Sequence, residues 1–179
     1  RGKFFTAKVL SCLVVALTVL GSSLLIVFVI MSVLNGTGSA KYPIAFDPNA
    51  FSSFAVTQKS EILVYLGASR FLLYAFILFA LYIVFLTTFA CLSSVLSQES
   101  LNAMTASISV TFAAAVLQSP ISRMTYFSLF WPFSYGNAVT VMAGDAAGSM
   151  LAGFIVLISV SVLLVSISRI IFIKKDIIC

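Results

Sequence analysis

The chain has 179 residues, of which 61% are hydrophobic and 8% are charged, and its mean hydropathy is +1.18. Soluble domains carry about 25% charged residues, so this composition excludes a soluble globular protein. The length fits one membrane domain and leaves no room for a separate catalytic domain. The net charge of +5 does not indicate nucleic acid binding, because the basic residues flank apolar runs.

The chain opens with a basic segment over residues 1–8, and an uncharged apolar run follows over residues 9–34. A secretory signal has an apolar region of only about 7–15 residues, and this run is longer. A spanning helix needs about 20 apolar residues, so we expect one over 9–34. Cys12 in this run and Cys91 further on are interpreted as small hydrophobic residues, with no disulfide or metal site.

Residues 35–60 are polar and are interrupted by Gly and Pro, which predicts a loop. The loop is long enough for a short surface helix near residues 49–57. Asn35-Gly36-Thr37 fits the N-glycosylation pattern. An Asn-Gly turn that closes the preceding helix is the favoured interpretation of these residues.

The run over 71–96 contains no charged residue, and it predicts a second spanning helix over about 66–96. Arg70 lies near its start, where a long side chain can reach the headgroups. A short polar link over 97–100 separates this run from a third apolar run, 101–118. A link this short makes the two helices antiparallel neighbours, so a transmembrane hairpin is expected at the centre of the protein.

Small side chains recur every four residues along the third helix, at Ala103, Ser107, Thr111 and Ala115. Small residues at this spacing allow helices to approach closely in lipid. Helix packing is therefore the favoured role of this stripe. For Ser107, Thr111 and Ala115, a place along a transport pathway is the alternative.

Residues 118–147 are the most irregular part of the sequence. Pro120 is expected to end the third helix, and aromatic residues that include Trp131 and Tyr135 follow it, with Pro132 among them. Trp and Tyr favour the membrane–water interface, and non-helical backbone at membrane depth needs cover from protein or water. We expect an interfacial or shallow re-entrant hairpin that forms an outer lip. An aromatic anchor is favoured over a substrate gate.

A last apolar run over about 149–173 completes an all-α, polytopic transmembrane helix bundle with four spans: about 9–34, 66–96, 101–118 and 149–173. An even number of spans puts both termini on one side of the membrane. More basic residues flank the terminal face than the other face, which predicts cytosolic termini under the positive-inside rule.

The sequence contains no catalytic constellation. Glu99 and Asp145 fall at opposite membrane faces in this topology, there is no His, and no Gly-rich phosphate loop is present. No ionisable residue lies deep in a span, which argues against a proton-coupled pump. We therefore expect no enzyme activity and no catalytic, metal or cofactor site in this chain.

Four features follow one another over nearly the whole chain. The first is a basic segment that leads into an apolar helix over 1–10, and the second is a long helix that ends near Gln98 and is followed by a short turn and a small-residue helix. The third is Trp-Pro-Phe-Ser-Tyr over 131–135, and the fourth is Phe-Ile-Lys-Lys-Asp over 172–176. In this order they resemble the permease subunits of type-two ABC export systems. The resemblance implies that these are the C-terminal four of six spans, in a single permease domain truncated at its N-terminus.

The resemblance also implies a mechanism and partners. Two permease subunits, identical or different, would pair around a pathway in a bacterial-type plasma membrane, and each would dock on a separate ABC ATPase subunit. Membrane lipid would surround them, and no nucleic acid is expected. The residues facing the ATPase would be Arg1, Lys3, Lys8, Gln98 and Glu99. Two alternatives stay open: a small membrane immunity or assembly protein without its own transport cycle, and a secondary carrier built from repeats.

Overall fold

The structure is a computed structural model that describes residues 2–36, 38–39, 41–46, 64–97, 99–122, 125–137, 141 and 150–175. Four helices are long and apolar enough to cross a membrane, which confirms the all-α polytopic bundle. The elements in chain order are α1 (Gly2–Asn35), β1 (Pro43–Phe46), β2 (Val64–Gly67), α3 (Ala68–Leu96), α4 (Ser100–Ser122), α5 (Thr125–Phe130), the 3-10 helix η1 (Pro132–Gly136) and α7 (Met150–Lys175).

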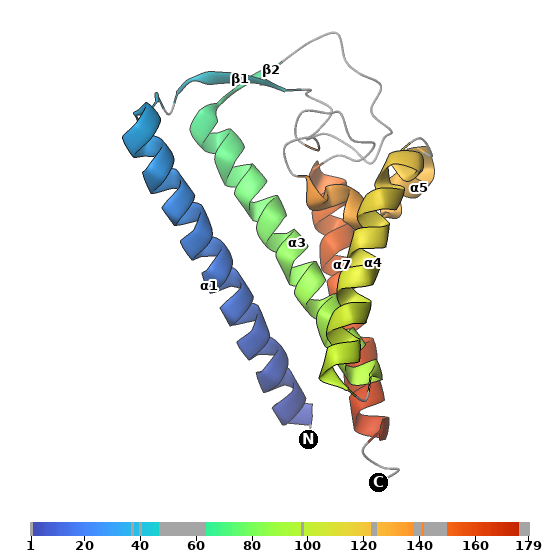
Figure 1. Cartoon of the computed structure of the whole chain (residues 1–179). Helices are drawn as coiled ribbons and strands as arrows, with labels where there is room; N and C mark the ends of the chain where they lie inside the picture. The colour runs from blue at the N-terminus through green and yellow to red at the C-terminus, as the bar shows by residue number, and fades with distance from the viewer. Residues whose placement is uncertain are drawn as a thin grey trace.

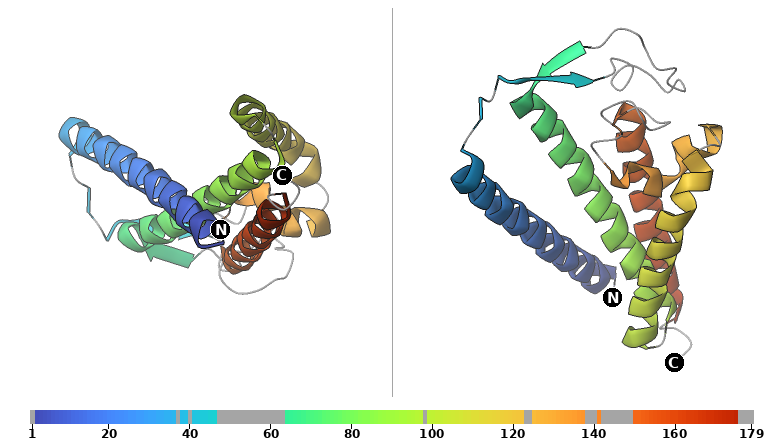
Figure 2. Two further views of the ribbon diagram at one scale, coloured as in Figure 1. Left: turned by 90° about the horizontal axis from the view of Figure 1, so that it is seen from below. Right: turned by 45° about the horizontal axis from the view of Figure 1, so that its top comes forward.

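The four long helices alternate in direction (Figure 1). The start of α1, the link between α3 and α4, and the end of α7 lie at one end of the bundle, which we call the terminal end. The strand pair and α5 lie at the opposite end, the loop end. Seen from the terminal end, α3, α4 and α7 gather together while α1 extends to one flank (Figure 2).

Apolar composition and internal hydrogen bonding explain why these segments are helices. No water is available in the bilayer core, so every backbone group of a spanning segment must bond within it. The hydroxyls follow the same rule: Thr18 Oγ1 donates to the Val14 carbonyl at 2.9 Å, and Thr87 Oγ1 donates to the Ile83 carbonyl at 2.8 Å. These residues can therefore lie in apolar helices without an unsatisfied donor.

The two strands were not predicted from the sequence. β1 pairs with β2 in antiparallel register, with Pro43 opposite Gly67 and Phe46 opposite Val64. The Ala68 amide then donates to the Tyr42 carbonyl at 2.9 Å, directly where α3 begins. The second span, expected over about 66–96, is confirmed as α3, and residues 66 and 67 just before it belong to the strand pair. The predicted helix near 49–57 lies outside the described residues.

Two helix ends test the predictions made from Gly and Pro. Gly36 follows the last residue of α1 and has a φ of +74°, a left-handed conformation typical of the residue after a helix. This confirms the Asn-Gly turn. The prediction that Pro120 ends the third helix is wrong, because α4 continues to Ser122. Proline removes a single backbone donor, and here the loss affects only the final turn.

The core lies where α3, α7 and η1 meet. Leu78 and Phe85 of α3, Tyr135 of η1 and Leu157 of α7 are all at most 2% exposed, and Ala114 of α4 packs against the same cluster. In α1, by contrast, the buried apolar residues are Phe5, Val9 and Leu20. Helix α1 is therefore held by few contacts, and most of its apolar surface is left for lipid.

Candidate functional site

The terminal end gathers most of the residues expected to face an ATPase. Lys3 and Lys8 lie exposed on the first turns of α1, and Glu99 lies exposed just before α4. The Asn102 side-chain amide donates to Glu99 Oε2 at 3.1 Å, which holds that carboxylate at the start of α4. Arg1 and Gln98, the other two predicted residues, lie outside the described residues.

Aromatic packing fastens α1 to α7 at this end. The rings of Phe5 and Phe172 have centroids 5.3 Å apart and are tilted by 34°. One turn away, Gly2 lies against Arg169, whose guanidinium Nη2 would be 3.3 Å from a Cβ placed on Gly2. A force applied to the first turn of α1 therefore reaches α7 directly.

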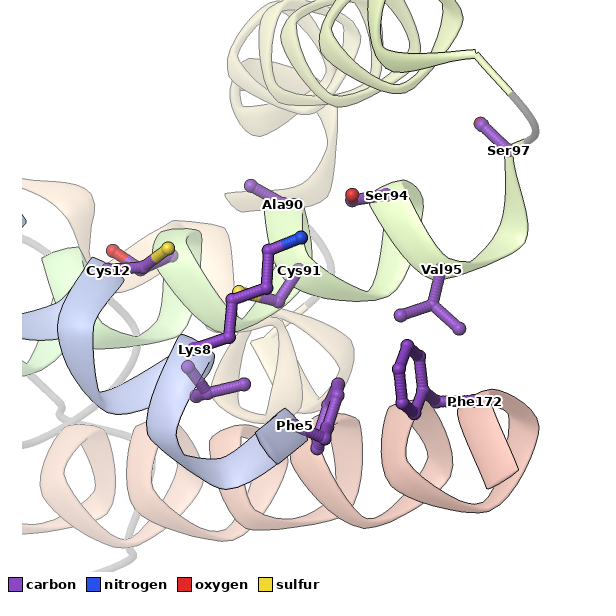
Figure 3. A pocket seen from close by; sticks show the side chains of 11 residues that line it. Phe5, Lys8, Cys12, Ala90, Cys91, Ser94, Val95, Ser97 and Phe172 are labelled. Carbon is purple, nitrogen blue, oxygen red and sulfur yellow. The ribbon is translucent and has the colours of Figure 1, made fainter. Parts of the chain in front are cut away.

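A pocket of about 370 Å³ lies between α1, α3 and α7 next to this contact (Figure 3). Lys8 is its only cation among the described residues, and no carboxylate lines it. The wall is formed by apolar, hydroxyl and thiol side chains, namely Phe5, Val9 and Cys12 of α1, Thr87, Ala90, Cys91, Ser94, Val95 and Ser97 around α3, and Phe172 of α7.

The pocket brings together two cysteines that lie far apart in the sequence. Cys12 of α1 and Cys91 of α3 are both free thiols that line it. In Figure 3 their sulfur atoms point toward one another beside the Lys8 ammonium. The one sequence signal for this pair was topological: Cys12 lies in the early turns of one span and Cys91 in the last turns of the next, so antiparallel packing puts both near the terminal end.

The small-residue stripe lies along a shallow groove of about 470 Å³ between α3 and α4. Ala103 is buried, Ser107 and Thr111 are half-buried, and Ala115 is exposed. The stripe therefore packs at its terminal end and opens toward its loop end. Ser107 Oγ donates to the Met104 carbonyl at 2.9 Å and Thr111 Oγ1 to the Ser107 carbonyl at 2.8 Å, so both hydroxyl donors are already used within α4.

The segment predicted as an outer lip packs into the bundle as an aromatic wedge, which we define as residues 131–136. Phe133 makes an edge contact with Phe85 of α3, with centroids 5.1 Å apart and planes at 81°. Phe85 belongs to the second half of α3, so the wedge reaches well below the loop end of the bundle. In the wedge, Phe133 and Tyr135 are buried and the other residues are half-buried, so protein covers part of this segment.

Tyr135 anchors this wedge rather than facing solvent. It is 1% exposed, and its hydroxyl donates to the Leu129 carbonyl at 2.7 Å. Trp131 is half-buried and stacks on Phe127, with centroids 5.6 Å apart. Pro132 begins the 3-10 turn, where its missing N–H costs no hydrogen bond. The three residues proposed for the outer lip thus form one packed unit.

The apolar helices make the chain an integral membrane protein. Among the described residues, no group of three or more His, Cys, Asp or Glu could hold a metal ion. The terminal-end pocket, the α3–α4 groove and the aromatic wedge are the three features around which a function can be built. No family model, curated protein or solved structure matches the chain.

Proposed function

We propose that the chain is a membrane-spanning subunit of an ATP-driven exporter, in which a separate ABC ATPase subunit supplies the energy. The main observation in support is that three helices converge at the terminal end. Helix α1 contacts α7 through Phe5 and Phe172. The pocket beside this contact is lined by residues of α1, α3 and α7. An ATPase that moves this end would shift all three helices together.

The charge at the terminal end supports this docking surface. Lys3, Lys8, Arg169 and Lys174 are exposed there, whereas Lys41 and Arg70 are the exposed described cations toward the loop end. The excess of basic residues at the terminal end favours a cytosolic location for it, in a bacterial-type plasma membrane. An ATPase that uses cytosolic ATP would then meet the start of α1 and the α3–α4 link.

The α3–α4 groove supports a pathway formed by two subunits. The groove is open along Thr111 and Ala115, and Phe112 beside them is 71% exposed. The described spanning helices contain no Asp or Glu, so they offer no carboxylate for proton coupling. A second permease subunit against this face would close the groove. Without a carboxylate for proton coupling, the energy for transport would come from ATP. The aromatic wedge would then seal the outer side.

Co-purification tests the proposal. The full chain is expressed with a tag in its native membranes, extracted in mild detergent, and its partners and ATP hydrolysis are measured. We expect an ATPase with a phosphate-binding loop in the complex, and less of it after Lys8→Glu, with unchanged amounts of the chain in the membrane. Lys41→Glu, at the loop end, is the matched control. Recovery of the intact chain without any ATPase would refute the proposal.

A further inference from the structure

Two thiols from different helices face each other in the terminal-end pocket. Cys12 lies on α1 and is exposed, while Cys91 lies on α3 and is half-buried. Both side chains line the same pocket, and Figure 3 shows their sulfur atoms on two neighbouring helices. A thiol that acts only as a small hydrophobe needs no such partner.

The surroundings make this pair reachable from outside the protein. The pocket is open, and it extends from Cys12 past Lys8 to Ser97, where α3 ends. The Lys8 ammonium is its only cation among the described residues, and no described carboxylate lines it. A small anionic molecule is therefore attracted toward the thiols by charge.

We propose that Cys12 and Cys91 are a modification site, a dithiol that closes reversibly to an interhelical disulfide on reaction with a small anionic disulfide such as oxidised glutathione. The exposed Cys12 thiolate attacks one sulfur of that molecule, which forms a mixed disulfide and releases one small thiolate. The Cys91 thiolate then attacks the Cys12 sulfur and expels the second. The two protons lost by the cysteines end on the two released thiols, so one disulfide is exchanged for another.

The bond would join the least restrained helix to the centre of the bundle. The buried apolar residues of α1 are Phe5, Val9 and Leu20. The large apolar residues of α1 that follow Leu20 are exposed. A link from Cys12 to α3 would add a covalent tie between α1 and α3 beside the Phe5–Phe172 contact. A disulfide formed by thiol exchange can be opened again by the same reaction in reverse, which fits a reversible lock. The inference stands independently of the proposed ATPase.

The test uses the full chain in phospholipid vesicles. The protein is exposed to oxidised glutathione, denatured, alkylated with N-ethylmaleimide, and its intact mass is measured. The sequence has three cysteines. After oxidation we expect neither Cys12 nor Cys91 to be alkylated, and after reduction we expect all three cysteines to be alkylated. Digestion should give a linked pair of peptides that contain Cys12 and Cys91.

Variants separate this outcome from accidental oxidation. In Cys91→Ser, the Cys12 thiol should stop at the mixed disulfide with glutathione, and Cys179→Ser should leave the bridge unchanged. Oxidation should also raise the melting temperature of the wild type but not of Cys91→Ser. Three alkylated cysteines in the oxidised wild type, or a stable glutathione adduct on Cys12 while Cys91 is still present, would overturn the proposal.

Discussion

The contact between Gly153 and Tyr135 gives the sharpest prediction from this structure. Gly153 lies in the outer turns of α7, directly against the aromatic wedge. A Cβ placed on Gly153 would lie 2.6 Å from Tyr135 Cδ1 and 2.9 Å from its Cε1. The ring cannot turn away freely, because it is buried and its hydroxyl is bonded to the Leu129 carbonyl.

The substitution Gly153→Ala should therefore destabilise the protein although alanine is the better helix former. Forcing a methyl group into a packed interior costs about 1–3 kcal/mol, and alanine gains about 0.5–1 kcal/mol over glycine within a helix. The free energy of unfolding should fall by about 1 kcal/mol. The matched control is Gly21→Ala in α1, where nothing lies within 4 Å of the new Cβ. This control should gain stability, so the two substitutions differ in sign.

Unfolding of the purified chain by titration from mild detergent into sodium dodecyl sulfate measures both free energies. A double-mutant cycle with Tyr135→Leu isolates the contact, because the loss caused by Gly153→Ala should shrink once the ring is absent. If Gly153→Ala stabilises the chain as much as Gly21→Ala does, the wedge does not pack against α7 as described.

Three further predictions test other parts of the molecule. Ser107→Leu faces an open groove, so its loss of thermal stability should resemble that of Ile108→Leu and stay below about 1.5 kcal/mol; a larger loss would show that the groove is closed. Tyr135→Phe leaves the Leu129 carbonyl without its buried donor and should cost about 1–3 kcal/mol of unfolding free energy, whereas an unchanged value would show that the bond contributes nothing. Glu99→Lys should lower ATP-driven export at an unchanged membrane level, and normal export would exclude this residue from docking.

The spans could be predicted because each depends only on the length and apolar character of one continuous run of residues. A long uncharged run such as 71–96 has one way to satisfy its backbone in lipid, and the short link 97–100 leaves only an antiparallel return. The Asn35–Gly36 turn was similarly local, since Gly36 adopts a conformation that side chains disfavour. Each of these predictions needed only neighbouring residues.

The features that were missed depend on contacts between distant segments. β2 could be recognised only through its pairing with β1, which is distant from it in the sequence. Pro120 does not end α4, because its missing N–H donor falls in the last turn of the helix. The pairing of Cys12 with Cys91 and the fit of Tyr135 against Gly153 require the side-to-side placement of helices, which hydropathy does not specify.

Site-directed cross-linking tests the central claim most directly. In a cysteine-free variant of the full chain, Lys8→Cys and Glu99→Cys carry a thiol cross-linker at the terminal end, and Lys41→Cys carries it at the loop end. We expect both terminal-end positions to cross-link to an ATPase in native membranes, with yields that change on adding ATP and vanadate. The Lys41 position should not cross-link. Equal yields at all three positions, or no ATPase product at either terminal-end position, would contradict an exporter subunit driven from this end.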